Sequence, residues 1–193
     1  KKVTENLSLV PISDYNKSKM IAERVLMSYQ KKIKIFCIRP ATVCGYSKNM
    51  RLDVSVNMFV HQALHKKIIT IFGGNQIRPN IHIVDLCRVF TFFIKKNLKT
   101  GFYNAGFENL KIYEIAKKIN NYTNCKIKVI KQTKDPRSYR QDSTKLLKTG
   151  FKPNFNVDMA IKELITCFKL KKIKISQNFF RVKFMKKKKL LKK

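Results

Sequence analysis

The chain has 193 residues, 44% of them hydrophobic, and a formal net charge of +32. This length and apolar content suffice for a buried core, which excludes an unfolded chain as the default expectation. The charge raises the possibility of nucleic-acid binding, but 35 of the 43 basic residues are lysines spread along the chain. Because base recognition relies on the planar guanidinium of arginine, this composition disfavours a nucleic-acid partner.

Apolar periods of two and of about 3.6 alternate from residue 1 to about 168, which predicts an α/β fold. Ser13 or Asp14 can cap a first helix that runs to about Tyr29. The further elements, in chain order, are expected to be a strand at 33–38, a helix at 54–64, strands at 68–72 and 81–84, a helix from Asp85 to about 96, a strand from 101, a helix at 110–120, a strand at 125–130 and a helix at 157–168.

The sequence carries no sign of a membrane span, a disulfide framework or a metal site. No stretch of about 18 apolar residues occurs, and the first residues lack an apolar signal core, so we expect a cytoplasmic protein. The five cysteines are widely spaced and form no CxxC pair. His61 and His65 have a spacing that suits a metal clamp, but no acidic or cysteine partner lies near them in sequence. We therefore predict no metal.

Glycine is scarce, with six residues in the whole chain and no GxGxxG or GxxGxxG pattern. A turn that cradles a pyrophosphate needs glycine where the backbone approaches the phosphates. The 193 residues are therefore expected to lack a complete dinucleotide site.

The most specific local pattern is YxxxK, formed by Tyr15 and Lys19 at the start of the first predicted helix. Residues four apart lie on one helix face, so the phenol and the ammonium can point into one pocket. Tyrosine is normally a weak base, because a phenol has a pKa of about 10. A neighbouring cation favours the phenolate, which suits a general acid or base. In a chain so rich in lysine, the alternative is a solvated helix face.

Around this pattern lies an ordered set of segments that resembles the extended short-chain dehydrogenase/reductases, the NAD-dependent epimerase/dehydratase family. The similar segments are Thr4 and Glu5 with Pro11 and Ser13 before Tyr15; the RPATVCG turn in residues 38–45; the block at 71–85 that contains FGGNQ and RPNIHIVD; YNAG at 103–106; DPRSY at 135–139 with Asp142 and Lys145; and TGFKP at 149–153.

The resemblance implies a fold with two parts. One part is the C-terminal portion of a Rossmann-type NAD(P)-binding fold, without its glycine-rich N-terminal half. The other part is a small α/β lobe that binds substrate. Residues 1–168 would form this epimerase/dehydratase domain. Residues 169–193, with 12 basic residues and no acidic one, would form a Lys-rich tail that is either disordered or a short helix.

The resemblance also implies roles for individual residues. Tyr15 would move a proton on a sugar hydroxyl, and Lys19 would bind the nicotinamide ribose of NAD or NADP. The cofactor-binding residues would be Tyr15, Lys19, Pro40, Thr42 and Val43, and the substrate-binding residues would be Asn57, Arg78 and Arg137. The activity would be that of a nucleotide-sugar epimerase or dehydratase in sugar activation for surface polysaccharide.

Two partners follow from the resemblance: a second copy, bound through the helix that runs from Tyr15 to Tyr29, and a separate N-terminal half. The catalytic serine or threonine of the family would precede Lys1. Two alternative interpretations stay open. The chain is an inactive fragment of the family, or it is a basic protein that binds nucleic acid or an anionic surface through its Lys-rich tail.

Overall fold

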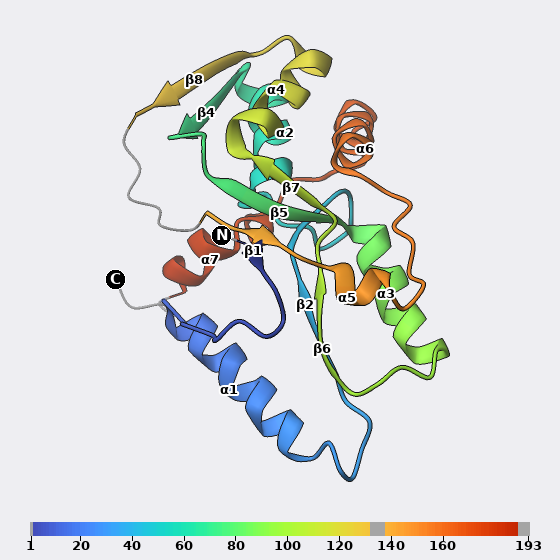
Figure 1. The fold of residues 1–193 in the computed structure, drawn as a ribbon. Helices are drawn as coiled ribbons and strands as arrows, with labels where there is room; N and C mark the ends of the chain where they lie inside the picture. The colour runs from blue at the N-terminus through green and yellow to red at the C-terminus, as the bar shows by residue number, and fades with distance from the viewer. Residues whose placement is uncertain (1, 132–137, 189–193) are drawn as a thin grey trace.

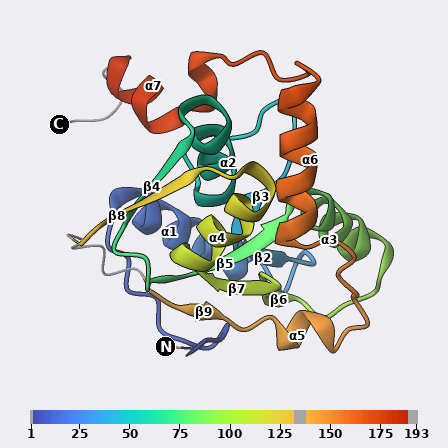
Figure 2. The same ribbon diagram turned by 90° about the horizontal axis from the view of Figure 1, so that it is seen from above.

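A computed structural model describes residues 2–131 and 138–188 of the chain (Figures 1 and 2). Its helices are α1 (Asp14–Ser28), α2 (Ser55–Lys66), α3 (Ile83–Lys95), α4 (Ile112–Thr123), α5 (Thr144–Leu147), α6 (Val157–Lys169), the 3₁₀ turn η1 (Gln177–Phe179) and α7 (Arg181–Lys187). Its strands are β1 (Lys2–Val3), β2 (Phe36–Pro40), β3 (Thr42–Cys44), β4 (Ile68–Phe72), β5 (Ile77–His82), β6 (Gly101–Ala105), β7 (Glu108–Lys111), β8 (Lys126–Ile130) and β9 (Arg140–Gln141).

The strands form small sheets in which parallel pairing predominates. β2 pairs in parallel with β6, β4 with β8, and β1 with β9. A three-stranded sheet has the order β3-β5-β7, and only its β5–β7 pair is antiparallel. Parallel strands joined through helices are typical of α/β proteins, so the predicted fold class is confirmed.

Two hydrophobic clusters hold these elements together. The larger cluster lies between α2, α4, α6 and β4 and includes Val56, Val60, Ile115 and Leu164, none of which exposes any surface. The smaller cluster joins α3 and α5 to β2 and β6. In Figure 1, α2 and α4 lie at one end of the molecule and α1 at the other. The end of the molecule that carries α2 and α4 therefore has the larger core.

Most predicted elements are present, with shifted boundaries. The strand predicted at 33–38 is β2, which starts three residues later because Ile33 is exposed, and which runs to Pro40. The strand predicted at 81–84 is β5, which starts at Ile77 although Pro79 lies within it. Pairing with β3 begins only at Asn80. Pro79, which has no backbone N–H, is therefore not required to donate a hydrogen bond to β3.

The predicted cap of α3 is wrong. His82, not Asp85, is the N-cap, and its Nδ1 accepts a hydrogen bond of 3.1 Å from the backbone N–H of Val84. Asp85 lies three residues further on, in the first turn of α3, and is fully buried. Its carboxylate accepts hydrogen bonds from the backbone N–H groups of Asn154 and Phe155, at 3.0 and 2.8 Å, and pairs with Arg88. Asp85 thus joins α3 to the segment that precedes α6.

The helix predicted at 110–120 is α4, which begins at Ile112. Leu110 belongs instead to β7, opposite Arg78 of β5. Glu114 accepts a 2.7 Å hydrogen bond from the backbone N–H of Lys111, and this bond fixes the start of α4.

The tail of residues 169–188 contains η1 and the short helix α7 and lies against the larger cluster. Phe179 and Phe180 are half-buried there, and the carbonyl of Phe179 accepts a 2.8 Å hydrogen bond from the N–H of Leu52. Across residues 2–131 and 138–188, no helix is both long and apolar enough to span a bilayer.

Candidate functional site

The two residues of the YxxxK pattern lie together at the start of α1. The hydroxyl of Ser13 caps the helix by accepting a 3.2 Å hydrogen bond from the N–H of Asn16. The ammonium of Lys19 lies 5.4 Å from the centroid of the Tyr15 ring. Tyr15 is 69% exposed, so its phenol is open to any group that approaches this face.

One ion pair fixes α1 to the end of β2. The guanidinium of Arg39 donates two hydrogen bonds to the carboxylate of Glu23, at 2.9 and 2.6 Å, and a third of 3.1 Å to the carbonyl of Glu5. The same guanidinium lies 4.5 Å from the centroid of the Phe102 ring on β6. Such a bidentate ion pair fixes both the distance and the angle between the guanidinium and the carboxylate. It ties the helix that carries Tyr15 to the strand that leads to Pro40.

Pro40, Thr42 and Val43 lie where β2 passes into β3. Pro40 is exposed, whereas Thr42 and Val43 are half-buried and pair with Asn80 and Ile81 of β5. Val43 also packs against the smaller hydrophobic cluster. The three residues predicted to line the nicotinamide therefore lie within the four positions 40–43 directly after Arg39, with buried Ala41 between Pro40 and Thr42.

Asn57 is 2% exposed and turned toward the backbone of its own chain. Its Oδ1 accepts a 3.1 Å hydrogen bond from the N–H of Gly45, and its Nδ2 donates to the carbonyl oxygens of Arg51 and Gly45, at 3.0 and 3.4 Å. Both ends of the carboxamide are thus engaged. Asn57 holds the turn that follows β3, a role that its position in the sequence did not indicate.

Glu163 and His82 support the same turn from the other side. The Glu163 carboxylate accepts a 3.1 Å hydrogen bond from the N–H of Tyr46 and lies 3.4 Å from Nε2 of His82. Burial lowers the pKa of His82, and the nearby Glu163 carboxylate opposes that effect. Gly45 has φ +103°, and a Cβ there would meet His82 and Glu163 at 3.2 Å. Sequence reasoning missed Glu163, because nothing in α6 distinguishes it from a surface residue.

Arg78 lies half-buried on β5 and does not itself line the open depression of about 480 Å³ that borders the start of this strand. Ser138 lines that depression, and its hydroxyl accepts a 3.1 Å hydrogen bond from the N–H of Ile77, the residue before Arg78. The other lining residues are Gly73, Asn75, Gln76, Val129 and Lys131. Arg137, the second predicted phosphate ligand, lies outside the described residues.

His61 and His65 contact each other and the aromatic rings of α6 and the tail. Their ring centroids are 4.6 Å apart, and Phe168 and Phe180 lie within 6 Å of His61. Burial, together with the nearby charges of His65 and Lys66, lowers the pKa of His61. The part of the chain that the structure describes contains no group of three or more His, Cys, Asp or Glu residues that could hold a metal ion.

Comparison with known families assigns the chain. Residues 1–106, which include Tyr15, Lys19, Asn57 and Arg78, match the model of the NAD dependent epimerase/dehydratase family. The chain belongs to this family. The expected resemblance is therefore confirmed.

Individual epimerase/dehydratase family members are similar to parts of the chain. An uncharacterized UDP-glucose epimerase of Bacillus subtilis is 35% identical over 98 residues, which are 49% of this chain and 30% of that protein. A UDP-glucose 4-epimerase of Lactobacillus helveticus is 29% identical over 185 residues, which are 82% of this chain and 56% of that protein. The chain therefore spans less than two thirds of the length of either relative.

Solved structures of the family share the fold. A UDP-N-acetylglucosamine 4-epimerase from Bacillus cereus matches with a TM-score of 0.74 and 24% identity, over 87% of this chain and 59% of that one. A dTDP-glucose 4,6-dehydratase from Bacillus anthracis, solved in complex with NAD, matches with a TM-score of 0.76 and 18% identity, over 95% of this chain and 59% of that one. The described elements thus correspond to part of a Rossmann-type epimerase fold.

Proposed function

We propose that the chain carries the acid–base pair and one wall of the sugar-nucleotide site of a nucleotide-sugar epimerase or dehydratase. The observation that carries this proposal is the Tyr15–Lys19 pair, exposed on a helix that the Glu23–Arg39 fork ties to the strand before Pro40. Family membership and the names of the curated relatives, both UDP-glucose epimerases, support it.

NAD or NADP is the proposed cofactor, since solved relatives are complexes with NAD or NADPH. The donors present fit part of such a molecule: the Tyr15 phenol and the Lys19 ammonium can both donate hydrogen bonds to ribose hydroxyls. The pyrophosphate would need a glycine-rich turn from a segment other than these 193 residues. When bound, the nicotinamide would accept a hydride from a sugar carbon and return it.

The residues of this chain would move the proton. Tyr15 would accept the proton of a sugar hydroxyl and later return it, with the ammonium of Lys19 5.4 Å from the centroid of its ring. Pro40, Thr42 and Val43 would form the wall beside the nicotinamide. Asn57 would act by holding the Gly45 turn in place. Its carboxamide is already bonded to the backbone of Gly45 and Arg51, which limits direct contact with the sugar nucleotide.

The diphosphate of the substrate would bind near the start of β5. Arg78 and Arg137 are the proposed ligands, because guanidinium groups match phosphate oxygens in geometry and charge. The open depression beside Ser138 would take the neighbouring part of the nucleotide.

The test is Tyr15→Phe in the chain supplied with an N-terminal glycine-rich segment of the family. We expect epimerase or dehydratase turnover on a UDP- or dTDP-sugar to fall by about 10²–10⁴, with binding of NAD retained. Tyr29→Phe, an exposed tyrosine at the end of the same helix, is the matched control and should leave turnover unchanged. Full turnover of the Tyr15→Phe variant with NAD bound would disprove the proposed role.

A further inference from the structure

The tail of residues 169–188 presents a basic and apolar surface that the proposed reaction does not use. Its basic residues in the structure are Lys169, Lys171, Lys172, Lys174, Arg181, Lys183, Lys186, Lys187 and Lys188, and no acidic residue interrupts them. All of them are exposed. This segment has the highest density of positive charge in the chain.

The tail is held in place by its own buried side, so its outer side is preformed. Phe179 and Phe180 pack against the larger cluster, and the Phe180 ring centroid lies 5.8 Å from that of His61. The carboxylate of Asp53 accepts a 3.1 Å hydrogen bond from the N–H of Val182 at the start of α7. Because these contacts order the segment in advance, a ligand of the outer surface would not have to fold it.

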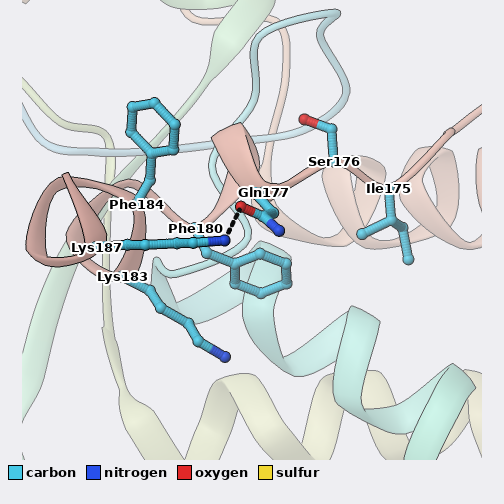
Figure 3. A pocket seen from close by; sticks show the side chains of 7 residues that line it. All are labelled: Ile175, Ser176, Gln177, Phe180, Lys183, Phe184 and Lys187. Carbon is cyan, nitrogen blue, oxygen red and sulfur yellow. Dashed lines mark hydrogen bonds between the residues drawn. The ribbon is translucent and has the colours of Figure 1, made fainter.

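The outer surface combines aliphatic side chains with lysines. Val182 and Met185 lie three residues apart on α7 and are 48% and 36% exposed. Beside α7 is a depression of about 470 Å³, shown in Figure 3, whose lining residues are Ile175, Ser176, Gln177, Phe180, Lys183, Phe184 and Lys187. Figure 3 shows the side chain of Lys187 reaching toward Gln177, whose Oε1 lies 3.4 Å from its Nζ.

We propose that this surface binds the anionic headgroups of a lipid bilayer. Val182 and Met185 enter the boundary between headgroups and acyl chains, and Arg181, Lys186 and Lys188, which flank them on the helix surface, lie among the headgroup phosphates. Aliphatic groups flanked by basic residues bind well at such an interface, because the free energy of apolar burial adds to the attraction between basic residues and anionic lipids.

The same surface fits nucleic acid less well. Binding to single strands relies on exposed aromatic rings on which bases stack. Here Phe179, Phe180 and Phe184 are half-buried, and the most exposed apolar side chains of the segment, such as Leu170 and Val182, are aliphatic. Arginine, which favours nucleic-acid recognition, is represented in the described tail by Arg181 alone.

The test is co-sedimentation of the whole chain with two kinds of vesicle: phosphatidylcholine alone, and equal parts phosphatidylcholine and phosphatidylglycerol. We expect binding to the anionic vesicles only, weakened by added salt. The triple variant Arg181→Gln, Lys186→Gln, Lys188→Gln should bind roughly a hundredfold more weakly. The double variant Val182→Ser, Met185→Ser should bind roughly tenfold more weakly.

The matched control is Lys95→Gln, Lys96→Gln, Lys99→Gln near the end of α3, which removes the same charge and should change binding by less than about threefold. Circular dichroism of each variant checks that it is folded. Equal binding to both kinds of vesicle would overturn the proposal. The proposal would also be overturned if the Val182→Ser, Met185→Ser variant bound anionic vesicles as tightly as the parent chain and single-stranded RNA displaced the vesicles. That result would make the surface a nucleic-acid site.

Discussion

Helices α1 and α2 have similar apolar residues but use them in opposite ways. On α2, Val56 and Val60 are fully buried in the larger cluster. On α1 no residue is buried, and Ile21 and Val25 are each 55% exposed. Isolated apolar residues on a surface are normal, whereas a row of them along one helix marks a contact surface. The stability of the chain therefore resides around α2, whereas the apolar row of α1 is left uncovered by the rest of the described chain.

The largest effect expected from this comparison is on stability. Leu164→Ala removes a fully buried side chain of α6 beside α2 and should lower the free energy of unfolding by about 2–5 kcal/mol. Leu26→Ala makes the same chemical change on α1, where the side chain is 49% exposed, and should cost less than about 1 kcal/mol. Urea unfolding measures both. Equal losses would show that α1 is packed as firmly as α6.

A smaller effect should follow from breaking the ion pair between Glu23 and Arg39, which holds α1. Glu23→Gln leaves the charge of Arg39 without its carboxylate at a site where both side chains are largely buried, 20% and 17% exposed. We expect a loss of about 1–3 kcal/mol and faster hydrogen exchange of the α1 amides. Asp14→Asn, which removes an exposed pair with Lys17, should have no measurable effect. Unchanged exchange in Glu23→Gln would show that other contacts hold the helix.

Acid should loosen the segment before α1 ahead of the core. The hydroxyl and N–H of Thr144 and the ammonium of Lys2 lower the pKa of Asp142 to about 2. A carboxyl with a lowered pKa stabilises the fold above its unfolded pKa of about 3.9. That contribution, about 1 kcal/mol for a partly solvated group, is lost as the pH falls from about 4 to 2. The midpoint of unfolding should depend less on pH in Asp142→Asn than in the parent chain over this range. An equal pH dependence in the two chains would contradict the assignment.

Local signals in the sequence predict most of the fold, whereas contacts between residues far apart in the sequence could not be predicted from it. The cap at Ser13 and the strand at 68–72 follow from neighbouring residues, and both are present. The local pattern predicts Asp85 as the cap of α3. No neighbouring residue reveals that the N–H groups of residues 154 and 155 donate to its carboxylate.

The candidate site shows the same division. The i, i+4 spacing was enough to place Lys19 beside Tyr15. The engagement of Asn57 with the Gly45 backbone depends on a turn that the sequence does not define. The support from Glu163 spans 117 residues, so no window of sequence contains it.

The smallest expected effect on stability comes from the exposed row on α1, and it separates a contact surface from an ordinary one. Ile21→Ser with Val25→Ser should change the free energy of unfolding by less than about 0.5 kcal/mol, because neither side chain is buried in the chain itself. If a second copy covers this row, as the family resemblance implies, sedimentation should show the double variant shifted from dimer to monomer. Ile94→Ser on α3, 85% exposed, is the control and should leave the oligomeric state unchanged. A double variant that dimerises like the parent would show that the α1 row does not form a dimer interface.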